Sequence, residues 1–123
     1  MANTISINGS FSLTSGASRA VGTLTDSLTL TGSNYTATGQ NILSGSWSPL
    51  STGSLNDFRY SFFQNADLTS SITIATGSGG QNVLAYLNPE DVYVLPWSGS
   101  VVPTLFAKAT TNDSLLIYIV SEK

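Results

Sequence analysis

Two adjacent carboxylates, Glu90 and Asp91, are the residues of this chain that come nearest to a reactive pair. They lie in the stretch VLAYLNPEDVYVLPW, between two apolar segments. Glycosidases use two carboxyl groups about 5 to 9.5 Å apart that face a cleft. Neighbours at a turn usually point apart into water, and Asn88 and Pro89 suit the first two positions of a type I turn. We therefore interpret Glu90 and Asp91 as turn residues.

Two other kinds of chemistry require groups that lie apart in the sequence. An enzyme would need Glu90, Asp91, Asp57 or Asp67 to gather in one cleft that raises one carboxyl pKa. A calcium ion would need loop oxygens. The candidate oxygens belong to Asn88, Glu90 and Asp91 at one turn and to Asn65 and Asp67 at another. The chain has no Cys and no His, which removes thiolate nucleophiles, the usual zinc sites and the commonest general base. We predict no enzymatic activity, no metal site and no cofactor.

The aromatic residues are the remaining candidates for direct ligand binding. Trp47, Trp97 and Tyr93 could form a platform on which a sugar stacks, because aromatic faces offer a large contact area. The alternative is that each Trp closes one end of a hydrophobic core. A carbohydrate-binding module is therefore an alternative function for this chain.

The charge content of the chain argues against two classes of partner. Charged residues make up 9% of the 123 residues, and the formal net charge is −3. The four cations, Arg19, Arg59, Lys108 and Lys123, are scattered along the chain, so we expect no nucleic-acid binding. No segment reaches the roughly 18 apolar residues of a membrane span, and the N-terminus lacks a secretory signal. We expect a soluble protein made in a cytosol.

Alternating apolar and polar residues between Gly, Asn, Asp and Pro breaks predict an all-β fold with little or no helix. We expect residues 1–123 to form one antiparallel β-sandwich domain of the jelly-roll kind. Its N-terminal region, about residues 1–53, is rich in Ser, Thr and Gly. There the pattern predicts short strands weakly fixed in register, and this region can include a docking arm.

The strand pattern is stronger in the second half of the chain. In DFRYSFFQ a period of two places Phe58, Tyr60 and Phe62 on one face. In SSITIAT the same period places Ile72 and Ile74 toward the core. Such half-buried strands are typical of a sandwich layer.

The last strand is apolar at six successive positions, from Leu115 to Val120, so both of its faces need cover. We expect Leu115, Ile117 and Ile119 to face the core. The residues predicted to face a neighbouring subunit are Leu116, Tyr118 and Val120. The reverse facing is the alternative. Arg59 lies among aromatic residues, and its predicted role is either an interface ion pair or aromatic stacking, with ordinary exposure as the alternative.

Three stretches of the second half carry a resemblance to a family of viral proteins. FQNADLTSSITI resembles a strand, an Asn turn and a Ser/Thr-rich strand; LNPEDVYVLPW resembles an L-x-P-G-E-x-x-x-L bend; and LFAKATTNDSLLIYIV resembles an L-Y-A-K-A-S-x-x-x-x-L-x-Y-I-V ending. Together, from about Phe58 to Val120, they are similar to small tailed-bacteriophage virion proteins of the capsid decoration or cement type. The chain departs from that pattern at Glu90, where the family favours Gly, and in its N-terminal half.

The resemblance implies a non-enzymatic virion structural protein that stabilises a phage capsid through strand-edge and apolar contacts. The implied partners are the major capsid protein and further copies of the chain, with a trimer as the expected oligomer. The implied location is the virion, after synthesis in the host cytoplasm. The alternative is a receptor- or carbohydrate-binding module of a phage tail, for which the sugar-stacking residues would be Trp47, Trp97 and Tyr93.

Overall fold

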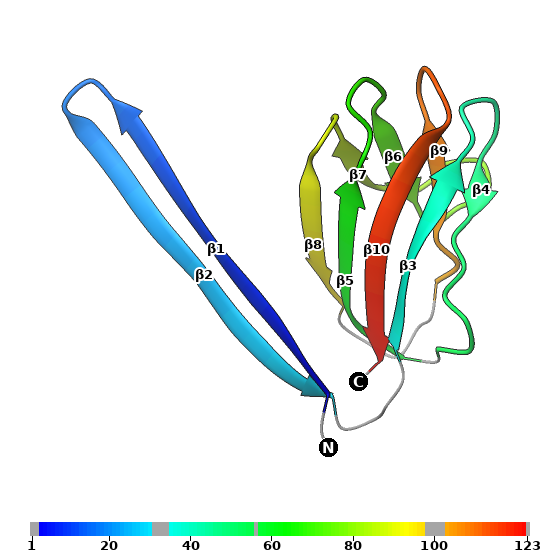
Figure 1. Cartoon of the computed structure of the whole chain (residues 1–123), viewed down its shortest axis with the longest axis horizontal. Coiled ribbons are helices and arrows are strands. Elements are labelled where there is room, and N and C mark those ends of the chain that lie inside the picture. The colour runs from blue at the N-terminus through cyan, green and yellow to red at the C-terminus, as the bar shows by residue number, and fades with distance from the viewer. Residues whose placement is uncertain (1–2, 31–34, 56, 98–102, 123) are drawn as a thin grey trace. The chain divides into compact units, whose positions relative to one another are not determined.

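The protein is built from β-strands, as the computed structural model in Figure 1 shows. The structure describes residues 3–30, 35–55, 57–97 and 103–122. No helix in these ranges is long and apolar enough to cross a membrane. The chain divides into two compact units, Met1–Ser33 and Asn34–Lys123. The first unit is a two-stranded hairpin and the second contains two antiparallel sheets, which confirms the predicted all-β sandwich class.

Ten strands make up the described parts of these two units. The hairpin contains β1 (Asn3–Ser15) and β2 (Ser18–Leu30). The strands of the second unit are β3 (Tyr35–Ile42), β4 (Ser48–Pro49), β5 (Phe58–Asn65), β6 (Ile72–Ala75), β7 (Val83–Leu87), β8 (Val92–Pro96), β9 (Phe106–Ala109) and β10 (Ser114–Glu122). The region expected to extend to about residue 53 therefore contains both the hairpin and the first two strands of the sandwich.

The hairpin is one continuous antiparallel ribbon. Its register runs without a break from Asn3 opposite Leu30 to Ser15 opposite Ser18. The connecting residue Gly16 has a φ of 59°, whereas the φ of Ala17 is not positive, which defines a type II′ turn. A two-residue turn of this kind fixes the register from the closed end of the ribbon. The expectation of several short strands is therefore wrong for this segment, which contains two strands of 13 residues each.

The register sorts the hairpin residues into two faces of different composition, because directly opposed residues share a face. One face, which we call the apolar side, contains the pairs Asn3 with Leu30, Ile5 with Leu28, Ile7 with Asp26, Gly9 with Leu24, Phe11 with Gly22, and Leu13 with Ala20. The other face, the polar side, contains Thr4 with Thr29, Ser6 with Ser27, Asn8 with Thr25, Ser10 with Thr23, Ser12 with Val21, and Thr14 with Arg19.

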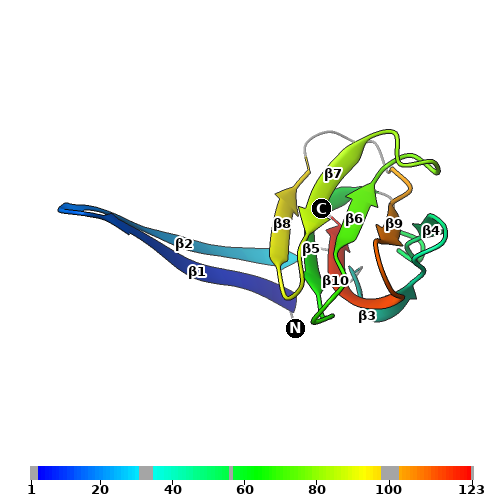
Figure 2. The same ribbon diagram turned by 90° about the horizontal axis from the view of Figure 1, so that it is seen from above.

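The second unit is a sandwich of two four-stranded sheets, which Figure 2 shows as two layers. The sheet with the longer strands has the order β3-β10-β5-β8, and we call it the long-strand sheet. The other sheet, the short-strand sheet, has the order β4-β9-β6-β7. All pairings in both sheets are antiparallel.

The strands of the sandwich pair in a nested sequence. β3 pairs with β10, β4 with β9, β5 with β8, and β6 with β7. The chain therefore runs as one long hairpin of four successive strand pairs, and alternate pairs belong to alternate sheets. Pairings between β10 and β5 and between β9 and β6 then join the pairs within each sheet.

The long strands bury one face in the core between the two sheets. The largest buried side chains are Tyr118, Phe58, Phe63, Ile42, Ile72, Ile74, Leu87, Leu105, Leu116 and Val120. The prediction that Leu116, Tyr118 and Val120 face a neighbouring subunit is therefore wrong, and the alternative facing of β10 holds. Periodicity could not decide between the two faces, because six successive apolar residues carry no alternation. The predicted inward positions of Ile72 and Ile74 are confirmed.

Strand β5 also departs from its predicted facing. Phe58 is buried with Ser61 and Phe63, whereas Tyr60 and Phe62 are only half-buried. The register between β10 and β5 shifts beside Phe58, between Ser121 and Glu122. Such an irregularity changes the side to which a residue points. The prediction that Phe58 shares a face with Tyr60 and Phe62 is therefore wrong.

Candidate functional site

The adjacent carboxylates Glu90 and Asp91 lie in the turn between β7 and β8. The backbone N–H of Asp91 donates to the carbonyl oxygen of Asn88 at 3.0 Å. One Asp91 oxygen, Oδ2, accepts bonds from the backbone N and from Nδ2 of Asn88, at 2.9 and 3.1 Å. Asp91 therefore stabilises the turn, as predicted from Asn88 and Pro89.

The type of this turn differs from the prediction. Glu90 has a φ of 68°, and it is the only non-glycine residue in the described parts of the chain with a positive φ. A positive φ after Pro89 defines a type II turn rather than the predicted type I turn. This position favours Gly, because a Cβ is disfavoured in the left-handed region.

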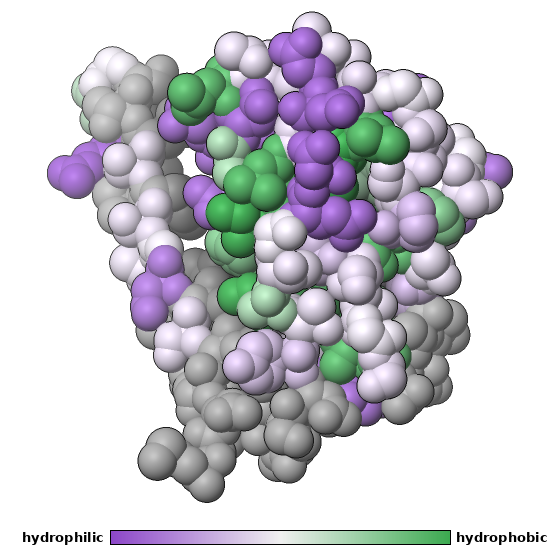
Figure 3. All heavy atoms as spheres, turned by 45° about the vertical axis from the view of Figure 1, so that its right-hand side comes forward, coloured by the Kyte–Doolittle hydropathy of each residue, from purple (hydrophilic) through white to green (hydrophobic). Residues whose placement is uncertain are grey.

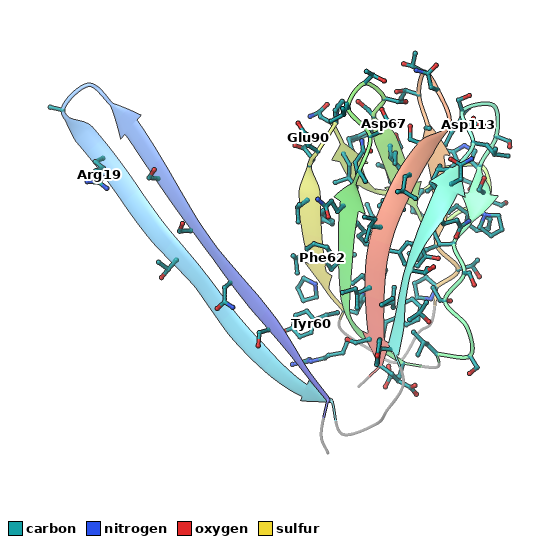
Figure 4. The ribbon with its side chains drawn as sticks, in the orientation of Figure 1. Arg19, Tyr60, Phe62, Asp67, Glu90 and Asp113 are labelled. Atoms are coloured by element: carbon teal, nitrogen blue, oxygen red, sulfur yellow. The ribbon has the colours of Figure 1, made fainter. Side chains whose placement is uncertain are left out.

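Asp67 caps the loop between β5 and β6. Its Oδ1 accepts from the backbone N of Thr69 at 2.7 Å and of Ser70 at 2.8 Å. These bonds, that of Thr69 first, hold the pKa of Asp67 below its usual value of 3.8. A general acid needs the opposite shift. Figure 4 shows Asp67, Glu90 and Asp113 at the same end of the sandwich.

Three of the side chains proposed for calcium, those of Asn65, Asp67 and Asp91, have an oxygen that accepts hydrogen bonds from the protein. Asn65 Oδ1 accepts from the backbone N of Asp67 at 3.0 Å, and Asp91 Oδ2 is bound by Asn88. Within the described ranges, no group of three Asp, Glu, His or Cys residues is placed to hold a metal ion. These loops therefore have structural roles that account for their polar side chains.

Asn65 is a buried polar residue, predicted from the sequence as a turn residue and a candidate calcium ligand. Its Nδ2 donates to the carbonyl oxygens of Ser70, Leu87 and Asn88, at 2.8, 3.1 and 3.1 Å. Its backbone N donates to the carbonyl oxygen of Asp91 at 3.0 Å. One side chain thus connects the end of β5 with two loops. In the sequence, Asn65 is an Asn at the end of an apolar strand. An ordinary turn residue gives the same pattern, so the buried role of Asn65 could not be recognised there.

The structure does not bring the three proposed sugar-stacking residues together. Trp97 and Tyr93 belong to the β8 edge of the sandwich and pack against the core. Trp97 donates from Nε1 to Ser61 Oγ at 2.6 Å and meets Phe58 edge to face at 5.7 Å. Trp47 precedes β4, at the other edge of its sheet from β7, and lies so close to Gly80 that a Cβ there would collide with its ring.

The outer face of the long-strand sheet is an apolar surface that the register defines. One row across the sheet consists of Ala37, Ile119, Phe62 and Val94. The next row consists of Gly39, Ile117, Gln64 and Val92. Leu115 opposite Asn41 and Tyr60 opposite Pro96 extend these rows at either end. We call these twelve residues the outer face.

The outer face is open to solvent and carries no charged residue. Val92 is 53% exposed, Leu115 45% and Ile117 37%. Leu115 leans over β3, where a Cβ on Gly39 would lie 3.3 Å from its Cδ1. Figure 3 shows green apolar surface beside hydrophilic surface on the sandwich. A contiguous apolar patch of this kind marks an interaction surface.

Arg59 borders the outer face at the start of β5. It is exposed, and its guanidinium carbon lies 5.4 Å from the centre of the Tyr60 ring. Aromatic stacking and ordinary exposure are predicted as alternatives for Arg59. In the structure both occur, because the exposed guanidinium lies beside the Tyr60 ring. The interface role of Arg59 stays a prediction.

Comparison with protein-family models, curated proteins and solved structures finds no match to this chain. A function can therefore be inferred only from the geometry of the described residues. The described residues present an uncharged, apolar sheet face and, in a separate unit, a hairpin with an apolar side. Both features are suited to association with other macromolecules.

Proposed function

We propose that this chain is a virion structural protein, without enzymatic activity, that decorates and stabilises a phage capsid. The observation that carries the proposal is the outer face, because a structural protein needs broad apolar contacts rather than reactive groups. The proposed partners are the major capsid protein and further copies of the chain. The proposed location is the virion, and no cofactor is required.

We infer that the sandwich is a jelly roll, the fold expected from the resemblance. The support is the nested pairing of β3 with β10, β4 with β9, β5 with β8, and β6 with β7. A jelly roll contains eight strands in two sheets, with Greek-key connections. Many viral capsid proteins contain this fold, but fold alone does not establish function.

The stretches that carry the resemblance occupy defined elements of the sandwich. FQNADLTSSITI extends from β5 into β6, LNPEDVYVLPW contains the β7–β8 turn, and LFAKATTNDSLLIYIV contains β9 and β10. At the bend where the family favours Gly, Glu90 has a positive φ. The backbone at this position therefore agrees with the family's residue preference, which supports the resemblance.

The hairpin is the proposed docking arm of the protein. A two-stranded ribbon is marginally stable alone in water, so its apolar side gains from cover by another surface. The ribbon contains two charged residues, Arg19 on the polar side and Asp26 on the apolar side, so its formal net charge is zero. We propose that the apolar side binds the major capsid protein.

The proposal can be tested with particles of the phage that encodes this chain. Peptide mass spectrometry of purified virions is expected to find the chain in many copies per particle. Particles made without the gene are expected to assemble but to lose their DNA at a lower temperature, and added purified protein should restore the resistance. Virions that lack the chain would contradict the proposal.

A matched pair of variants tests the docking arm. Phe11→Lys places a charge on the apolar side opposite Gly22, whereas Ser10→Lys places the same charge on the polar side at the neighbouring position. Phe11→Lys is expected to abolish binding to particles that lack the chain, and Ser10→Lys should bind as the unaltered protein does. Equal binding by both variants would exclude the apolar side as the contact.

A further inference from the structure

Both strands of the hairpin are edge strands, because β1 and β2 form a sheet of only two strands. Each strand is 13 residues long. A long edge strand presents unpaired backbone N–H and C=O groups, and together with an apolar face it is a template on which a second chain can add. The hairpin combines a long edge with an apolar side, so a second copy of the hairpin could associate with it.

The edge strands of the sandwich show three ways in which such edges are protected. β4 and β7 are short, with two and five residues. β8 ends at Pro96, whose nitrogen carries no N–H. The side chains of β3 hold a neighbouring segment, since Gln40 donates to the Pro49 carbonyl oxygen at 2.9 Å and Thr36 donates to that of Thr52 at 3.0 Å. The hairpin strands are long, and neither contains Pro.

Charge is a further means of protecting an edge strand, and the hairpin has very little of it. Strand β1 contains no charged residue. Strand β2 contains Arg19, which lies next to the turn on the polar side, and Asp26. The register places Asp26 on the apolar side, opposite Ile7 and between Leu24 and Leu28 of the same strand. Within β1 and β2, Asp26 is thus the one charge on the apolar side.

We propose that Asp26 prevents the apolar sides of two hairpins from associating. Two such sides packed face to face would bury two carboxylates, and neither side contains a cation to pair with them. Burial of an unpaired charge is strongly unfavourable. Parallel addition of identical strands in register would also place the Asp26 carboxylates of neighbouring copies side by side, where they repel. The inference does not rest on the proposed function, and it leaves the sandwich free to join copies of the chain.

The first test measures self-association of the full-length chain by sedimentation velocity, from about 1 to about 100 µM. Asp26→Leu is expected to raise the association constant at least about 10-fold over the unaltered protein. Asp26→Asn, which removes the charge and adds no apolar area, should raise it by a smaller factor. Asp26→Lys should associate as the unaltered protein does, because a charge of either sign opposes burial.

Ser27→Leu is the matched control for the first test. It places the same apolar side chain at the next position of β2, on the polar side of the hairpin, and should leave the association unchanged. Near-ultraviolet circular dichroism, to which Trp97 contributes, follows the sandwich and identifies any association that results from unfolding. If Asp26→Leu disturbs the sandwich, Asp26→Asn takes its place in the comparison.

The second test locates the added association with a second substitution in the Asp26→Leu variant. Phe11→Lys returns a charge to the apolar side, whereas Ser10→Lys places the same charge on the polar side. Phe11→Lys is expected to abolish the added association, and Ser10→Lys should preserve it. The two double variants have the same net charge, so a difference between them depends on the side of the hairpin alone.

Four results would overturn the proposal. The first is that Asp26→Leu and Asp26→Asn associate no more than the unaltered protein. The second is that Asp26→Lys associates as strongly as Asp26→Leu, which would show that the charge is not the obstacle. The third is that Ser27→Leu has the same effect as Asp26→Leu, and the fourth is that the added association survives Phe11→Lys. None of these results depends on virions, so the proposed function is tested separately by the composition of the particles.

Discussion

Asn65 connects three segments of the sandwich through one side-chain amide. Its Nδ2 donates to carbonyl oxygens in the β5–β6 loop, at the end of β7 and in the β7–β8 turn. The residue is fully buried, so its side-chain amide has no water to replace these bonds. An amide is required because it supplies both a donor and an acceptor at this position.

Asn65→Asp is expected to lower the free energy of unfolding by about 3 kcal/mol, because a buried carboxylate would face several carbonyl oxygens. Urea denaturation measures the loss. Asn82→Asp, at an exposed position in the β6–β7 loop, is the control and should change stability by less than about 0.5 kcal/mol. Equal effects of the two substitutions would show that the three bonds of Asn65 contribute nothing specific.

Glu90 has a backbone conformation that glycine adopts more easily. Glu90→Gly is expected to raise the free energy of unfolding by about 0.5 to 1 kcal/mol, since it removes a Cβ from the left-handed region. Asp91→Ala should instead lower it by about 1 kcal/mol through the loss of the bonds to Asn88. Thermal unfolding measures both, and a destabilised Glu90→Gly variant would contradict the positive φ.

The lowered pKa of Asp67 makes part of the stability depend on pH. Because the pKa is lower in the folded chain than the usual 3.8, ionised Asp67 stabilises the fold above that pH. This contribution is lost as the pH falls through the folded-state pKa. The difference in unfolding free energy between the unaltered protein and Asp67→Asn should therefore shrink from about pH 6 to about pH 2. A constant difference over this range would contradict the assignment.

At the scale of elements, the hairpin depends on its register more than on any one residue. A shift by one position would move every apolar residue to the other face. The Gly16 turn fixes the register, and it places Ser10 directly opposite Thr23. Two residues further along β2, Thr25 lies opposite Asn8.

The chain has no Cys, so an introduced cysteine pair reports this register directly. Ser10→Cys with Thr23→Cys is expected to form a disulfide readily on mild oxidation, because opposed residues have Cβ atoms about 4.5 to 5.5 Å apart. Ser10→Cys with Thr25→Cys is the control, since diagonal neighbours lie too far apart. Mass spectrometry after alkylation measures the yield, and equal yields would indicate a register that slips.

Strand β10 shows where periodicity fails as a guide to facing. Its six apolar residues predict that both faces need cover, and the structure buries one of them, the face of Leu116, Tyr118 and Val120. Which face enters the core depends on Tyr118, whose hydroxyl donates to the Ser51 carbonyl oxygen at 2.7 Å, with Gln40 Oε1 as a second acceptor 3.0 Å away. Burial raises the pKa of Tyr118, and the bond to Ser51 opposes that rise. Tyr118→Lys, which the predicted interface would tolerate, is instead expected to unfold the sandwich.

At the scale of the whole molecule, the two units differ in how many neighbouring strands each strand is hydrogen-bonded to. Each central strand of the sandwich pairs on both sides, whereas β1 and β2 pair only with each other. Local opening is easiest where few contacts oppose it. In dilute solution, backbone amides of the hairpin should exchange with solvent much faster than those of β5 and β10. Hydrogen exchange measured by NMR checks this, and equal protection would mean that both units open together.

The sandwich itself could be predicted in class from the sequence, because strand and turn signals are local. The turn at Asn88 and Pro89 and the inward positions of Ile72 and Ile74 follow from residue type and period alone. The burial of Phe58 could not be predicted, because it depends on a register shift between β10 and β5 that no local signal marks. The type II turn at Glu90 was missed because Glu is an uncommon residue at a positive φ.

The sequence by itself determined the all-β class, the positions of most turns and the near absence of charge. These properties depend on residues close to one another in the chain. The tertiary structure alone decided the nested strand pairs, the hydrogen bonds of the Asn65 side chain and the composition of the outer face. One row of that face consists of Ala37, Ile119, Phe62 and Val94. Such a row joins residues far apart in sequence, and its composition follows from strand order and register, which are set by packing of the whole sandwich.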